Sequence, residues 1–92
     1  MVKKEENIII DLLSSSGAAY RGQGIALCIK RKNVSPEIAD ILKSLKNDNI
    51  CVLGRPLSSY AIAALDILNI ERYQGDDADI QDLIKGLPVA FA

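Results

Sequence analysis

Two cysteines are the residues of this chain whose chemistry is most reactive. Cys28 and Cys51 both lie among apolar neighbours, which raise the pKa of a thiol and so disfavour a nucleophile. The sequence has no histidine, the side chain that most often serves as general base, as partner of a Ser or Cys nucleophile and as zinc ligand. We therefore expect no catalytic residues, and we expect both thiols to be buried, reduced and structural.

Two short stretches begin like known ligand-binding motifs and then depart from them. Gly22-Gln23-Gly24 resembles the start of a dinucleotide fingerprint, but Leu27 replaces the third glycine and no strand precedes it. Asp76-Asp77-Ala78-Asp79 lacks the glycine and the twelfth-position glutamate of a calcium loop. Helix capping explains these aspartates more simply. The sequence therefore predicts no cofactor and no metal site.

A nucleic-acid partner and a membrane are both unexpected. Lys30-Arg31-Lys32 lies at the end of an expected helix, where the helix dipole already favours cations. No aromatic residue is interleaved with it, and the sequence pI is about 5.3, so the basic surface is too small for nucleic acid. No run reaches the roughly 18 apolar residues of a membrane span, and the first residues do not resemble a secretory signal. We expect a cytoplasmic protein.

A five-residue pattern occurs three times, at residues 9–13, 38–42 and 80–84, each time with isoleucine first and aspartate in the centre. The last two copies are 42 residues apart, a period typical of stacked helical hairpins. Ninety-two residues with 49% hydrophobic and 25% charged side chains suit a single domain over residues 1–92. The prediction is one all-α domain.

Caps and apolar periodicity predict about five helices. They cover residues 4–15 and 18–32, a third from the N-cap Ser35 to about Asn47, a fourth from Pro56 to Leu68, and a fifth capped by Asp76 or Asp77 and stopped by Gly86 and Pro88. Residues 50–55 are expected to be a buried connection, because no second strand is evident. The expected core includes Ile38, Ile41, Leu42, Leu65, Leu68, Leu83 and Ile84.

The helices pair in a way that resembles HEAT-like repeats. Isoleucine and leucine recur on the first helix of each pair, whereas Gly24-Ile25-Ala26 and Ala61-Ile62-Ala63 align on the second helices. The resemblance covers nearly the whole chain and implies two and a half antiparallel hairpins. A compact five-helix bundle is the alternative.

Charge and tyrosine placement suggest where a partner binds. Residues 57–92 hold six acidic side chains against two basic ones, and Tyr73 lies in an acidic loop. The expected partner-binding residues are Glu71, Tyr73, Asp76, Asp77 and Asp79. Tyr20 and Tyr60 mark a possible second face, since tyrosine contributes a large contact area at low entropy cost. A core position fits Tyr60 equally well.

Three stretches resemble the short helical immunity proteins of bacterial contact-dependent inhibition and polymorphic toxin systems: Ile80-Gln81-Asp82-Leu83-Ile84, residues 60–68, and Tyr73-Gln74-Gly75-Asp76-Asp77. The resemblance implies a cytoplasmic, non-catalytic protein that binds one cognate toxin domain, often a nuclease, and blocks its active site. An acidic face suits that role, because a nuclease presents a basic cleft. The alternatives are a HEAT-like lyase of bilin chromophores and an adaptor or capping fragment of a larger assembly.

Overall fold

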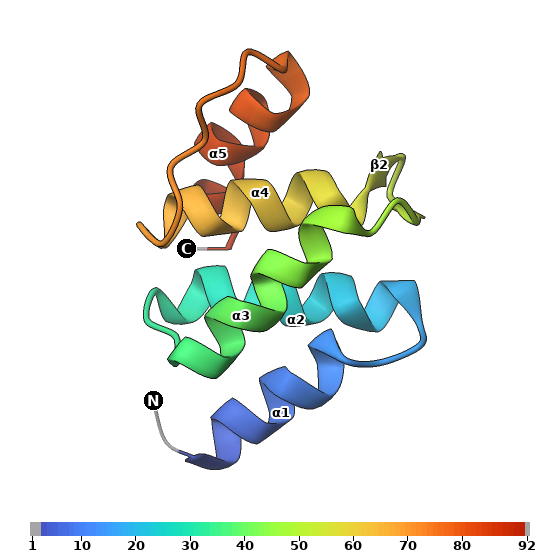
Figure 1. Cartoon of the computed structure of the whole chain (residues 1–92), viewed down its shortest axis with the longest axis vertical. Helices are drawn as coiled ribbons and strands as arrows, with labels where there is room; N and C mark the ends of the chain where they lie inside the picture. The colour runs from blue at the N-terminus through green and yellow to red at the C-terminus, as the bar shows by residue number, and fades with distance from the viewer. Residues whose placement is uncertain (1–2, 92) are drawn as a thin grey trace.

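The computed structural model describes residues 3–91 and has an all-α fold with one small hairpin of strands (Figure 1). The helices are α1 (Lys3–Leu13), α2 (Ala18–Arg31), α3 (Pro36–Ser44), α4 (Leu57–Ile67) and α5 (Ala78–Ala90). A 3-10 turn, η1 (Leu45–Asn47), extends α3, and the strands are β1 (Cys51–Val52) and β2 (Arg55–Pro56). The predicted fold class and the five helices are confirmed. No helix among the described residues has the length and apolar character that a membrane crossing requires.

Local capping explains where two of the helices begin. The Ser35 hydroxyl accepts a hydrogen bond from the Ile38 amide at 3.3 Å, and Pro36 occupies the first helical position. Asp77 caps α5, because its Oδ1 accepts from the amides of Asp79 (2.9 Å) and Ile80 (3.4 Å). Both caps lie where the sequence predicts them.

The first four helices form two antiparallel hairpins that stack in two layers. Helix α1 packs on α2 and α3 packs on α4, while α1 also contacts α3 and α2 contacts α4. Figure 1 shows α3 in front of α2, with α4 above both. Helix α5 packs mainly on α4, with a smaller contact on α2, so it lies against the second helices of the hairpins.

The third copy of the five-residue pattern buries different positions from the first two. Four first and fifth positions in α1 and α3 are at most 2% exposed: Ile9, Leu13, Ile38 and Leu42. In α5 the first and fourth positions, Ile80 and Leu83, are buried instead, and the fifth, Ile84, is only half-buried. The first position is buried in all three copies and only the second buried position moves, so the centre of the buried stripe turns by about 50°. The third copy therefore packs through a partly different side of its helix.

The predicted end of the fifth helix is wrong. Helix α5 continues through Gly86 and Pro88 to Ala90. Pro88 has no amide to donate to the carbonyl four residues earlier, but it lies in the last turn of α5, so little of the helix follows this gap. The Phe91 amide still donates to the Leu87 carbonyl at 3.0 Å, and Leu87 packs against the core.

The prediction of a buried connection at residues 50–55 is also wrong. Cys51 pairs with Pro56 and Val52 with Arg55, so this run and the following Pro56 supply both strands. The turn between them is Leu53-Gly54, with φ of 54° and 82°. Cys51 is exposed, which contradicts the expectation that both thiols are buried, whereas Cys28 is buried; neither forms a disulfide.

The core is formed by buried residues of α1, α2, α3 and α4, together with Leu45 of η1. Of the seven predicted core residues, Ile38, Leu42, Leu65 and Leu83 are buried, and the other three are partly buried: Ile41, Leu68 and Ile84.

Candidate functional site

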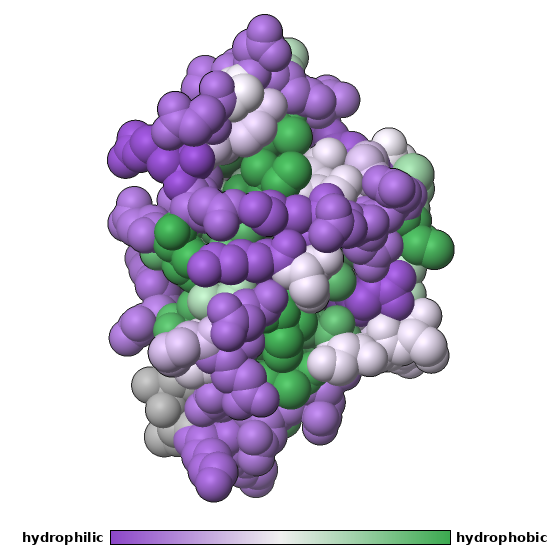
Figure 2. All heavy atoms as spheres, viewed as in Figure 1, coloured by the Kyte–Doolittle hydropathy of each residue, from purple (hydrophilic) through white to green (hydrophobic). Residues whose placement is uncertain are grey.

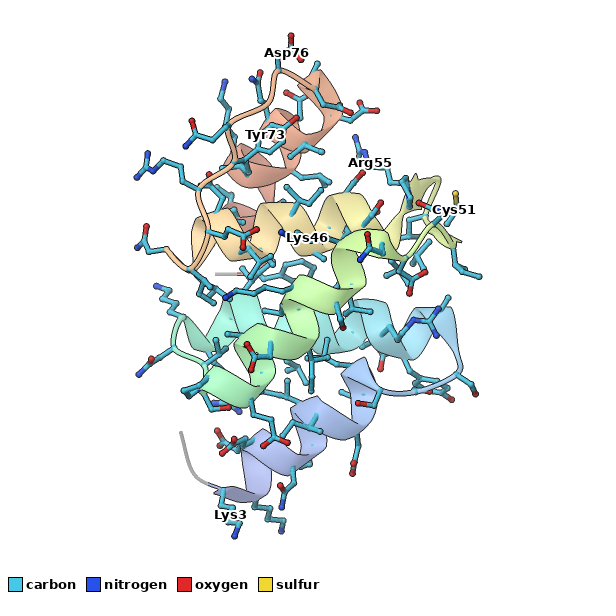
Figure 3. The ribbon with its side chains drawn as sticks, viewed as in Figure 1. Lys3, Lys46, Cys51, Arg55, Tyr73 and Asp76 are labelled. Carbon is cyan, nitrogen blue, oxygen red and sulfur yellow. The ribbon has the colours of Figure 1, made fainter. Side chains whose placement is uncertain are left out.

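The predicted acidic edge does not form a single free surface. Glu71 makes an ion pair with Lys46 of η1, and hydrogen bonding to that ammonium lowers the pKa of the Glu71 carboxyl. Figure 3 shows Lys46 at the centre of the molecule and Asp76 at its top, in the loop between α4 and α5. Glu71 is therefore already engaged within the chain.

Tyr73 and Asp77 are in contact, and this contact supports the loop before α5. The Tyr73 amide donates to Asp66 Oδ2 at 2.8 Å, and its hydroxyl accepts from the Asp77 amide at 3.0 Å. A Cβ at Gly75 would lie 2.4 Å from that hydroxyl, so any larger residue there would displace the Tyr73 ring. Tyr73 thus closes the loop that leads into α5, where Asp77 serves as the cap.

Asp76 and Asp79 are the remaining members of the predicted edge. Both are exposed, and their side chains make no ion pair or hydrogen bond with residues 3–91. Asp82, on the same helix as Asp79, is exposed as well. Asp76 and Asp79 of the predicted edge, together with Asp82, are therefore exposed carboxylates without a partner in residues 3–91.

The two other tyrosines do not share a surface in the way the sequence suggests. Tyr20 is 56% exposed at the start of α2, where its ring lies beside Gly17. Tyr60 is half-buried on α4, and its hydroxyl donates to the Val52 carbonyl at 3.0 Å. Only Tyr60 lines the hollow described next.

An apolar groove of about 540 Å³ lies between α2, the β1–β2 hairpin, α4 and α5. Its residues are Ala19, Gly22, Gln23, Ile25, Ala26 and Ile29 of α2, Val52, Leu53 and Arg55 of the hairpin, Tyr60, and Leu83, Leu87 and Phe91 at the C-terminal side. We call this the α2–α5 groove. A second hollow of about 510 Å³ adjoins it, since Ile29 and Phe91 line both.

Small side chains on α2 keep the groove open. Ala19, Gly22 and Ala26 face it at helical spacing. A Cβ added at Gly22 would meet only Val52 at 3.6 Å and Leu57 at 4.0 Å, outside α2's own backbone. Leu83 and Leu87 of α5 form the opposite wall of the groove. They reach it because α5 packs against α4 and α2.

The hairpin is anchored at its base by Asp48. Its Oδ2 forms an ion pair with Arg21 Nε at 2.9 Å, and both side chains are largely buried. Its Oδ1 accepts from the Ile50 amide at 3.1 Å, and its carbonyl accepts from the Ser58 amide at 2.7 Å. The groove wall formed by the hairpin is therefore fixed to α2 and to the start of α4.

Leu53 at the tip of the hairpin is both exposed to solvent and strained in its backbone. It is 91% exposed, the largest exposed fraction among the exposed large hydrophobic residues described. Its φ of 54° is also a left-handed conformation that favours glycine or asparagine, and it is strained for leucine. Figure 2 shows apolar atoms at the surface on the right, at the hairpin end of the molecule. Elsewhere on this face, apolar atoms lie mostly between hydrophilic side chains.

Arg55 is the one charged residue that lines the α2–α5 groove. It is half-buried, and its guanidinium makes no ion pair or side-chain hydrogen bond with residues 3–91. In Figure 3 it extends from the hairpin toward the space beside α5, while the sulfur of Cys51 points away from the helices. The groove thus combines apolar walls with a single cation.

Within the described part of the chain, the groove lining holds no thiol and no carboxylate. No group of three or more His, Cys, Asp or Glu among residues 3–91 is arranged to hold a metal ion. Burial raises the pKa of the Cys28 thiol to about 12, so it stays protonated near neutral pH.

Sequence reasoning missed most of the groove. The signal that was present is Gly54 at the second position of a two-residue connection, Leu53-Gly54, which is the length of a hairpin turn. Comparison of this chain with protein-family models, with curated proteins and with solved structures finds no match.

Proposed function

We propose that this chain is a non-catalytic protein-binding domain and that its binding surface is the α2–α5 groove with the hairpin tip. The observation that carries the proposal is Leu53, a strained and almost fully exposed leucine beside an apolar groove. Apolar surface of this kind, rimmed by polar residues, is typical of sites that bind another protein. A partner that covered Leu53 would recover the free energy lost by exposing it.

A narrower proposal concerns the partner. The resemblance to immunity proteins suggests a toxin domain, and a nuclease would present a basic surface. Asp76, Asp79 and Asp82 favour this, because they are exposed and make no ion pair with residues 3–91. Rim charges of this kind act mainly by accelerating association.

The groove is tested by a variant that keeps the turn but removes the apolar side chain. Leu53→Asn suits a left-handed turn position, so it should fold at least as well as the native chain. Ile8→Asn is the matched control, because Ile8 is 48% exposed on α1 and does not line the groove. Capture of partners by the tagged chain, with crosslinking and mass spectrometry, should lose the specific protein for Leu53→Asn and keep it for Ile8→Asn. Equal capture by both variants would exclude the groove as the binding surface.

The nuclease proposal is tested once a captured protein is identified. The purified partner should cleave nucleic acid, and the native chain should inhibit that cleavage. Asp76→Lys combined with Asp79→Lys should slow association and reduce its dependence on salt, while Asp77 is left intact because it caps α5. A partner without nuclease activity would reject this narrower proposal and leave the protein-binding one standing.

A further inference from the structure

We infer that the α2–α5 groove binds an amphipathic helix of a partner protein and that a carboxylate on this helix pairs with Arg55. The inference rests on the proposed protein-binding function and specifies the chemistry of the bound segment. It depends on three features of the groove: its length, its small-residue floor and its single unpaired cation.

The length of the groove suits about two turns of helix. Ala19 and Ala26, the outermost of the small α2 residues, are seven residues apart, which is about 10 Å along a helix axis. Leu83 and Phe91 extend over a similar distance on the opposite side. A bound helix contacts such a groove through apolar residues at i, i+3, i+4 and i+7, which also extend over about two turns.

The floor of the groove favours a helix because its side chains are small. Gly22 and the two alanines on either side of it present little bulk, and the distance between packed helix axes depends on the side chains at the contact. Leu53 then lies at the rim, where it can cover one side of a helix seated on this floor.

Charge decides what else the bound segment carries. Arg55 is half-buried among apolar residues and makes no ion pair or side-chain hydrogen bond with residues 3–91. A bound helix would remove water from around this guanidinium, and burying a charge without a partner is costly. A Glu or Asp beside the apolar stripe provides two acceptors in the geometry that an arginine prefers. The partner helix is therefore apolar on one side with an acidic residue at its margin.

The test uses synthetic helical peptides of about 16 residues, long enough to form a helix in solution. Each has leucine at i, i+3, i+4 and i+7, and a marginal position beside the stripe is Glu, Gln or Lys, scanned along the peptide. Binding is measured by fluorescence anisotropy, and the site is located by amide chemical-shift changes. At the favourable register, the Glu peptide should bind the native chain about tenfold more tightly than the Gln peptide.

Variants at Arg55 separate the ion pair from general stickiness. Arg55→Gln should abolish the difference between the Glu and Gln peptides, and Arg55→Glu should reverse the preference toward the Lys peptide. Arg55→Lys keeps the charge and should retain part of the preference for Glu. Arg72→Gln is the matched control, because Arg72 is exposed outside the groove. Helical spectra and melting temperatures confirm that each variant is folded, and the reversal cannot arise from unfolding.

Three outcomes would overturn the inference: equal affinity for the three peptides at every register, chemical-shift changes outside the groove, or a concentration-dependent dimer that Leu53→Asn abolishes. The last result would mean that a second copy of the chain fills the groove. The proposed function is judged by a separate experiment, the Leu53-dependent capture of a partner protein, which uses no peptide. Leu53-dependent capture without a preference for Glu would therefore reject the helix inference alone.

Discussion

The hydroxyl of Tyr60 donates a hydrogen bond to the backbone carbonyl of Val52 at 3.0 Å, and this contact joins α4 to the hairpin. Tyr60 also lines the α2–α5 groove, so one side chain both supports the hairpin and forms part of the surface beside it. The position of Leu53 over the groove depends on such contacts, because each strand has only two residues.

Removing this hydroxyl should loosen the hairpin. Tyr60→Phe is expected to lower the free energy of unfolding by about 1 kcal/mol and to speed hydrogen exchange in residues 51–56. Tyr20→Phe is the control, because the Tyr20 hydroxyl makes no hydrogen bond with residues 3–91. Unchanged exchange in Tyr60→Phe would show that the hydrogen bond does not hold the hairpin.

Two glycines of α2 should respond oppositely to the same substitution. A Cβ at Gly24 would lie 2.8 Å from Leu13 Cδ2 and 3.1 Å from the Leu13 amide nitrogen, so Gly24→Ala should destabilise the fold by about 1–3 kcal/mol. Gly22→Ala meets only ordinary contacts and should stabilise it by up to about 1 kcal/mol. Denaturant titration of the two variants measures both effects, and the same sign for both would contradict the close approach of α1 to Gly24.

The core should depend on Leu42, which has no exposed surface. Leu42→Ala is expected to cost about 2–5 kcal/mol, a large share of the stability of a domain this small. Ile8→Ala removes a similar volume from an exposed site and should change stability by less than about 0.5 kcal/mol. Equal melting temperatures for the two variants would contradict the assignment of the core.

The sequence predicts best those features that a few neighbouring residues decide. Ser35 and Asp77 cap helices because each side chain reaches an amide two or three positions along the chain. By contrast, the ion pair between Lys46 and Glu71 joins residues 25 positions apart, and no local pattern indicates it. The groove is of the second kind, because four separate segments form it.

The sequence does not decide which side of α5 is buried. Leu83 and Ile84 are both apolar, so the sequence predicts both in the core, although adjacent helical residues point about 100° apart. Contact with α4 and α2 decides for Leu83. No second strand is evident in the sequence because each strand has only two residues, and a leucine at φ 54° contradicts the residue preferences of such a turn.

The Glu71–Lys46 ion pair should make stability depend on pH. Hydrogen bonding to Lys46 lowers the pKa of the Glu71 carboxyl in the folded chain, so its contribution is present above the ordinary glutamate pKa. That contribution is lost as the pH falls through the lowered pKa. Carbon-detected NMR titration should show the low pKa, and Lys46→Gln should raise it. An unchanged pKa in Lys46→Gln would contradict the ion pair.

The two thiols should differ in reactivity. Cys51 is exposed and should react with iodoacetamide in the native state at pH 8, whereas Cys28 is buried with its pKa raised to about 12. Cys28 should react only after denaturant is added. Mass spectrometry counts the modified sites, and rapid double labelling of the native chain would show that α2 is less closely packed than described.

The rotated stripe of α5 has an evolutionary consequence. If the three copies of the pattern descend from one ancestral helix, then the third copy buries a different pair of positions from the first two and packs at a different location. A third unit stacked like the first two would have lengthened the array and left Gly22 and its neighbouring alanines without an opposite wall. Here the divergent copy supplies Leu83 and Leu87 to that wall instead. The α2–α5 groove thus exists because the third copy of the repeat is not structurally equivalent to the first two.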